Sequence, residues 1–184
     1  MPHLFRRISY LRSLALLPPV LCLVAAMCRA AAAEPLNAKD IMIVGQALHF
    51  VEPPLQGAIR VAVVYNQATP GSEREANQIV DQFDGELTVG SLSMRPVAVS
   101  LAQIAQTPFD ALISADGAGT ATLRQALMQR HVPCVTGHRE QVTDGFCQIY
   151  LTSQPNVDIQ LNQAASDAAS VHFATAFRIM IHTL

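Results

Sequence analysis

The sequence predicts an α/β protein: a single three-layer domain with a mixed central sheet, helices on both faces, and a C-terminal antiparallel strand pair followed by a helix. Two near-continuous apolar, β-branched runs, 58–65 and 109–115, are typical of strands covered on both faces. Segments with helical spacing of apolar residues alternate with such runs along the chain, as they do in layered α/β folds.

The individual elements follow from periodicity and from capping residues. Asn37 is the expected N-cap of the first helix, and Ser72 with Glu75 forms the S-x-x-E pattern of a capping box, which satisfies free N–H groups at a helix start. Ser100 with Gln103 is expected to cap a further short helix. Helices are predicted at 36–52, 73–83, after Ser100, at 120–130, and from Asn162 onward. Strands are predicted at 58–65, 86–100, 109–115, 132–137, 146–152 and 156–161.

The C-terminal part closes the expected domain. The strands 146–152 and 156–161 are predicted to form the antiparallel pair. A helix beginning near Asn162 should then pack on the sheet, because its apolar residues fall on one stripe. The stripe consists of Ala165, Ala169, Phe173, Phe177 and Ile181.

The first 33 residues have the order of a secretory signal peptide. Three arginines precede an apolar run of about fourteen residues, and small residues lie just before Glu34, which predicts cleavage after Ala33. A membrane-spanning helix needs roughly twenty apolar residues, so an anchor is the weaker interpretation. We therefore expect a signal peptide over 1–33, a single domain over 34–184, and a periplasmic location.

Charge argues against two classes of partner. Four of the twelve basic residues lie within residues 1–33, whereas all fourteen acidic residues follow, so 34–184 carries eight basic against fourteen acidic residues. It also contains no basic run. This acidic balance argues against nucleic acid and anionic lipid as partners.

The stretch "HVPCVTGHREQVTDGFCQIYL" holds the two cysteines that remain after the leader, Cys134 and Cys147. An isolated pair in an oxidising compartment usually forms a disulfide, and closing its twelve-residue loop would stabilise the fold by roughly 3 kcal/mol. Cys134 is expected to end one strand and Cys147 to begin the next. A zinc site that adds His131 and His138 is an alternative, although the spacing matches no compact zinc motif. A cysteine nucleophile with a histidine base is another, and it needs a free thiolate.

Other candidate sites have simpler interpretations. Gly117-x-Gly119 follows a strand and opens a helix, as a dinucleotide loop does, but Thr122 stands where the third glycine belongs. A tight strand-to-helix turn is favoured, with an anion at the free N–H groups as the alternative. Three groups are expected to be solvated or locally satisfied: the carboxylates Asp81, Asp84 and Glu86; the histidines His49, His172 and His182; and Arg178. No catalytic, cofactor-binding or metal-binding residue is predicted.

Several short motifs, in order, resemble the YfiR family of small periplasmic proteins. "ALHFVEPPLQGAIRVAVVY" resembles the family's opening helix and the corner before its first strand, and "FDALISADGAG" its middle strand and turn. "VPCVTG" resembles a later strand, and "VDIQLNQAASDAASVHFATAFRIMI" the closing strand and helix. The resemblance spans most of residues 37–184.

This resemblance implies a non-enzymatic regulator. YfiR-like proteins bind the periplasmic part of an inner-membrane diguanylate cyclase and hold it inactive, until an outer-membrane lipoprotein sequesters the repressor. Of the family's features, only the C-terminal disulfide has a counterpart here, in Cys134 and Cys147. We expect no cofactor and no nucleic acid, and a homodimer is a further possibility. The rival hypothesis is a single-lobe small-solute-binding protein, because "RVAVVYNQATPGSEREANQIV" resembles the first strand and helix of transporter substrate-binding components.

Overall fold

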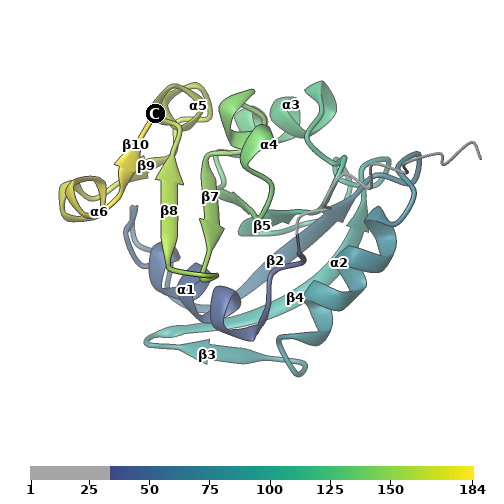
Figure 1. Ribbon diagram of the computed structural model, residues 1–184, viewed down its shortest axis with the longest axis horizontal. Coiled ribbons are helices and arrows are strands. Elements are labelled where there is room, and N and C mark those ends of the chain that lie inside the picture. Colours follow the sequence, from purple (N-terminus) through teal and green to yellow (C-terminus); the bar gives the residue numbers. More distant parts are fainter. Residues whose placement is uncertain (1–33) are drawn as a thin grey trace, which may run out of the picture. The chain divides into compact units, whose positions relative to one another are not determined.

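A computed structural model describes residues 34–184 (Figure 1). The predicted signal peptide, residues 1–33, lies outside the described residues. Among residues 34–184, no helix combines the length and the apolar character needed to cross a bilayer.

The centre of the fold is an eight-stranded mixed sheet in the order β3-β4-β2-β5-β6-β7-β8-β10. The strands are β2 (Gly57–Tyr65), β3 (Leu87–Val89), β4 (Leu92–Ser100), β5 (Ala111–Ser114), β6 (Cys134–Thr136), β7 (Ile149–Thr152), β8 (Asp158–Leu161) and β10 (His182–Thr183). Neighbours from β4 to β7 are parallel, whereas β3 and β8 run antiparallel to β4 and β7. A small second sheet pairs β1 (Val51–Glu52) with β9 (His172–Phe173).

Six helices accompany these strands in the described part of the chain: α1 (Ala38–Leu48), α2 (Ser72–Asp81), α3 (Ala121–Arg130), α4 (Arg139–Thr143), α5 (Gln163–Ala168) and α6 (Thr175–Met180). The chain leaves β2 through α2 to reach β4 on one side, and leaves β5 through α3 to reach β6 on the other. Because such crossovers are right-handed, α2 and α3 cover opposite faces of the sheet. The predicted α/β class, with helices around a mixed sheet and an antiparallel strand pair near the end, is confirmed.

The core strands are as apolar as their sequences predict. Val61, Ala62, Val63 and Val64 of β2 are all fully buried, which is expected for the central strand of a covered parallel sheet. All four residues of β5 are buried as well.

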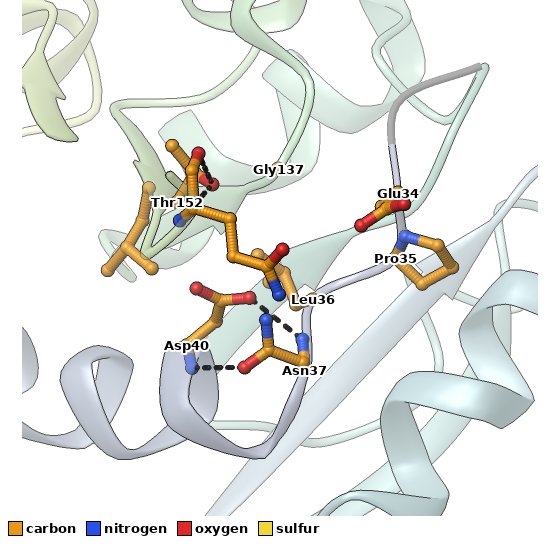
Figure 2. Close-up of a pocket in the computed structure, with 9 residues that line it drawn as sticks. Glu34, Pro35, Leu36, Asn37, Asp40, Gly137 and Thr152 are labelled. Atoms are coloured by element: carbon orange, nitrogen blue, oxygen red, sulfur yellow. Dashed lines mark hydrogen bonds between the residues drawn. The ribbon is translucent and has the colours of Figure 1, made fainter. Parts of the chain in front are cut away.

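The N-terminus of α1 is hydrogen-bonded to the turn between β7 and β8. Asn37 is its N-cap, as predicted, and Asp40 completes a capping box by accepting the backbone N–H of Asn37 (Figure 2). The other carboxylate oxygen of Asp40 accepts the backbone N–H of Ser153, in the β7–β8 turn, at 2.7 Å. The cavity beside this cap is only about 30 Å³, which is room for one water molecule.

Three predicted helices differ from the structure. The first ends at Leu48 instead of running to 52, because Val51 and Glu52 pair with β9. The segment after Ser100 forms only turns. The Ser72–Glu75 capping box is wrong: the N-cap of α2 is Gly71, which makes no side-chain cap.

Three further segments also differ. The extended segment 86–100 is a hairpin, β3 and β4, that turns at Gly90, whose φ is +56°. A helix follows the last strand pair with Asn162 as its N-cap, as predicted, but it ends at Ala168, and the chain continues as β9, α6 and β10. A short helix, α4, lies in the expected loop between the cysteines.

Candidate functional site

A polar cluster lies at the carboxyl ends of β2, β5 and β6. In chain order, the parallel strands β2, β4, β5, β6 and β7 are arranged 2-1-3-4-5, so the connections leave the β2–β5 pair in opposite directions. In open α/β sheets, ligands bind at the carboxyl ends of the strands beside this topological switch point. The loops that meet here are 66–71, 115–120 and 137–138.

His138 is the centre of the cluster. It is only 4% exposed, and its Nε2 lies 2.7 Å from Oε1 of Glu75, on α2. A carboxylate can only accept a hydrogen bond, so Nε2 carries the proton. The second oxygen of Glu75 accepts the backbone N–H of Asp116 at 3.0 Å. Glu75 therefore joins three segments of the chain that are distant in sequence.

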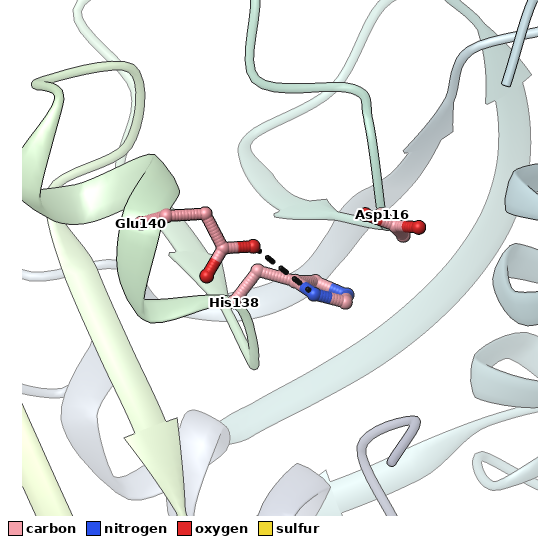
Figure 3. A group of neighbouring side chains, drawn as sticks. All are labelled: Asp116, His138 and Glu140. Atoms are coloured by element: carbon pink, nitrogen blue, oxygen red, sulfur yellow. Dashed lines mark ion pairs between the residues drawn. The ribbon is translucent and has the colours of Figure 1, made fainter. Parts of the chain in front are cut away.

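Asp116 and Glu140 lie beside the imidazole (Figure 3). One ligand atom from each of Asp116, His138 and Glu140 can be chosen such that all three lie within 4.8 Å of one another. Nδ1 of His138 is 3.6 Å from Oε1 of Glu140, which is too far for a direct hydrogen bond. Both carboxylates are exposed, so solvent reaches this side of the buried ring.

A buried amide holds the strand ends beneath the cluster. Gln141, at the start of α4, accepts a hydrogen bond from the Ser114 hydroxyl at 2.5 Å and donates one to the Ala115 carbonyl at 2.8 Å. Thr136 Oγ1 accepts the backbone N–H of His138. Because each of these partners is itself buried or anchored, His138 has little freedom to move.

The loop that carries Asp116 is held from the opposite side. Ser72 donates from its hydroxyl to the Asp116 carbonyl at 2.6 Å, and Asn66 donates from its side chain to the Gly117 carbonyl at 2.9 Å. Gly117 has φ +65°, and the side chain of Thr69 occupies the place where a Cβ would lie. The predicted tight strand-to-helix turn at Gly117-x-Gly119 is confirmed.

Opposing influences act on the pKa of His138. Burial acts to lower it, but the hydrogen bond and charge of Glu75, together with the charges of Asp116 and Glu140, outweigh burial and raise it above its ordinary value. A raised folded-state pKa stabilises the protein fully below the unfolded-state value near 6.5, and this contribution is lost as the pH rises through the folded-state pKa.

The raised pKa of His138 predicts how stability should depend on pH. In metal-free buffer, the difference in unfolding free energy between wild type and Glu75→Gln should be largest near pH 6 and should shrink as the pH rises. Urea titrations at several pH values measure the difference, and NMR of the ring gives the pKa directly. A difference that grows with pH would contradict the assignment.

The cysteine stretch forms a disulfide, which is the favoured prediction. The sulfur atoms of Cys134 and Cys147 are 2.08 Å apart, and both residues are fully buried. Cys134 begins β6 and does not end its strand as predicted. Because β6 and β7 are parallel, Cys134 and Cys147 lie at the same edge of the sheet, with Cα atoms 5.2 Å apart.

The disulfide leaves neither sulfur as a free thiolate, which both the zinc site and the cysteine nucleophile would require. The zinc set of His131, Cys134, His138 and Cys147 is not assembled, because both sulfurs are used. A ring nitrogen of His131 lies 3.0 Å from the Ala169 carbonyl, whereas His138 lies at the opposite edge of the sheet.

The remaining candidate site residues lie on the surface or are hydrogen-bonded locally. Glu86 pairs with Arg95 at 2.6 Å on the surface, and Asp81 and Asp84 are exposed. His49 is satisfied locally, with Nδ1 2.8 Å from the Gly45 carbonyl. The other side chains predicted to be peripheral, His172, His182 and Arg178, are also exposed.

Sequence reasoning missed the pair of Glu75 and His138. Glu75 was assigned to a capping box, and His138 to a cysteine-based zinc set. The pair is 63 residues apart. The sequence could have indicated the pair only through its place in the fold, since both residues lie in a loop or helix start that follows a parallel strand.

No protein-family model matches this chain, and no curated protein matches it.

A second feature lies at the amino ends of the strands. A groove of about 330 Å³ has apolar walls that include Leu55, Phe109 and Val132. Charged groups also line it, among them Asp110 and Arg130, whose guanidinium lies 4.6 Å from the centre of the Phe109 ring. Its size falls at the lower end of the range for small-molecule sites.

Proposed function

We propose that this chain is a non-enzymatic periplasmic regulatory protein, which represses an inner-membrane signalling protein of the diguanylate-cyclase type by direct contact. The observation that carries the proposal is an exposed apolar corner near the C-terminus. The leader-like first 33 residues and the YfiR-like motifs support the location and the class of partner.

The apolar corner consists of Val157, Ile179 and Met180. These side chains are 52%, 79% and 63% exposed, respectively. A shallow groove of about 120 Å³ beside them is lined by Ile159 and Ile181. Large apolar side chains gathered at one place on a surface are typical of sites where another protein binds.

The same corner carries an open sheet edge. β10 ends the strand order, so one side of its backbone pairs with β8 and the other side has no neighbour within residues 34–184. An added strand from a partner can pair with such an edge while its side chains cover the apolar residues. The corner therefore offers both of the contacts that a protein partner needs.

The partner follows from the expected compartment. An exported acidic protein with an apolar contact site meets the periplasmic regions of inner-membrane proteins. A diguanylate cyclase is the class that the YfiR-like motifs imply, with an outer-membrane lipoprotein as a second partner. The Cys134–Cys147 bond suits an oxidising compartment, because it persists there without reduction.

The double variant Ile179→Asp/Met180→Asp should weaken partner binding by at least about 30-fold, because truncating a central apolar anchor costs about 2 kcal/mol or more. A photo-crosslinker at position 179 identifies the partner in native membranes, and its periplasmic region is then titrated in solution. Folding should be unaffected, since both side chains are exposed.

Met128→Asp is the matched control, because Met128 is a 45% exposed methionine on α3, away from the corner. It should bind the partner as wild type does. Crosslinks that join only two copies of this chain would instead make the corner a homodimer interface. That result, or equal binding by both variants, would contradict the proposed function.

A small-solute-binding protein is the second candidate, favoured by the 330 Å³ groove. A bound solute should raise the melting temperature, since a ligand at 100 times its Kd stabilises the fold by about 2.7 kcal/mol. A thermal-shift screen with Phe109→Ala as the groove variant tests this. A solute that stabilises wild type but not the variant would favour the receptor.

A further inference from the structure

We infer that Asp116, His138 and Glu140 form a binding site for a divalent transition-metal ion such as Zn²⁺, with Glu75 as the residue that positions the imidazole. This site does not include any residue of the protein-binding corner.

The first support is the fixed ring of His138. Its Nε2–H donates to Glu75 at 2.7 Å, which leaves the lone pair of a neutral imidazole on Nδ1. Metal-ligating histidines almost always donate their other ring N–H to a carboxylate or carbonyl in this manner, because the bond fixes both tautomer and orientation. The described arrangement is therefore that of a ligand with its supporting carboxylate.

The second support is the separation of the ligand atoms. Two ligands of one tetrahedral zinc ion, each about 2.1 Å from the metal, lie roughly 3.4 Å apart. Nδ1 of His138 and Oε1 of Glu140 are 3.6 Å apart, and Asp116 supplies an oxygen within 4.8 Å of both other residues' ligand atoms. The Nδ1–Oε1 distance is longer than a direct hydrogen bond and close to the separation of two ligands on one zinc ion.

The third support is charge and access. Nδ1 lies near the Glu140 carboxylate, and the Asp116 carboxylate is close by, so the cluster carries negative charge that a cation would offset. His138 is 4% exposed whereas the Glu140 side chain is 66% exposed, so an ion would rest on a buried ligand and remain open to solvent on one side. Three protein ligands leave a coordination position for water or for an anionic group of another molecule.

The ligand types indicate the class of ion. Imidazole suits zinc, copper, iron and nickel, whereas sites made only of oxygen suit magnesium and calcium. We therefore expect Zn²⁺ to bind and an equal concentration of Mg²⁺ not to compete.

The test is isothermal titration of Zn²⁺ into tag-free, oxidised protein purified from the cell envelope and freed of metal with a chelator. We expect one saturable ion per chain and a shift of the His138 ring ¹⁵N signals. Loss of a supporting carboxylate alone lowers metal affinity 10–100-fold, so Glu75→Gln should show that loss, and Asp116→Asn and Glu140→Gln at least as much. Because the side chains of Asp116 and Glu140 are exposed, the variants Asp116→Asn and Glu140→Gln should fold as wild type does.

Two controls keep the inference open to refutation. Asp144→Asn removes an exposed carboxylate at the other end of α4, and His182→Ala removes an exposed histidine 3.5 Å from Asp158. Both should bind Zn²⁺ as wild type does. No saturable binding, equal affinity in all variants, or loss only in His182→Ala would each overturn the site.

Discussion

Replacing both cysteines, as Cys134→Ala/Cys147→Ala, should lower the free energy of unfolding by about 3 kcal/mol. The bond joins residues 13 apart, so its loss frees a loop of that length in the unfolded chain. Alanine is the right replacement because both sites are fully buried and apolar, and serine would add a buried hydroxyl. For a domain of this size, the melting temperature should fall by roughly 6–12 °C.

Calorimetry of the oxidised wild type and of the double variant measures this change. Wild type kept in reductant provides the control, because it lacks the bond but keeps both sulfur atoms, and its melting temperature should fall close to that of the variant. A double variant as stable as the oxidised wild type would mean that the disulfide contributes nothing to the fold.

Asp40→Ala should cost a similar amount, about 3 kcal/mol. Asp40 is 3% exposed, and its carboxylate accepts the backbone N–H groups of Asn37 and Ser153. A hydrogen bond to a charged group contributes about 1.5–3 kcal/mol, and the variant leaves the Ser153 N–H buried without an acceptor. The loss should loosen both the start of α1 and the β7–β8 turn.

Urea denaturation measures the loss, and hydrogen exchange at Ser153 locates it. Asp40→Asn keeps one acceptor oxygen and should lose only about half as much. Asp81→Ala, which removes an exposed aspartate at the end of α2, should change stability by less than about 0.5 kcal/mol. Equal losses in Asp40→Ala and Asp81→Ala would show that the hydrogen bonds of Asp40 are unimportant.

The centre of the sheet was predictable because the strands β2 and β5 are largely apolar on both faces. The segments 58–65 and 109–115 became β2 and β5 with small shifts at their ends, and the last two strands pair as expected. Local capping was predictable only in part. Asn37 caps α1 as expected, whereas Ser72 uses its hydroxyl on the distant Asp116 carbonyl and not on its own helix.

The helix after the strand pair is present as α5, but its predicted continuation to Ile181 is wrong, because the buried residues there belong to separate short elements. Ala169, Phe173 and Phe177 are buried, as the stripe required. The helix α5 nevertheless ends at Ala168, Ser170 has a φ of +54°, and Phe173 pairs with Val51 in the small sheet. Buried residues that lie four positions apart do not require one continuous helix. The same spacing arises here from successive short elements that each bury one side chain.

The candidate metal site was not predictable from local patterns. Its residues come from α2, the β5–α3 loop, the β6–α4 loop and α4 itself, and they meet because β2, β5 and β6 are parallel neighbours. The sequence predicted these strands but not their order, so it could not place Glu75 beside His138.

The disulfide also makes a covalent ring of residues 134–147, and this ring includes His138 and Glu140. A protease that cuts within this ring, for example beside the exposed residues Thr143 and Asp144, would open it without releasing a fragment. The nicked protein would migrate as one band without reductant and as two bands with it.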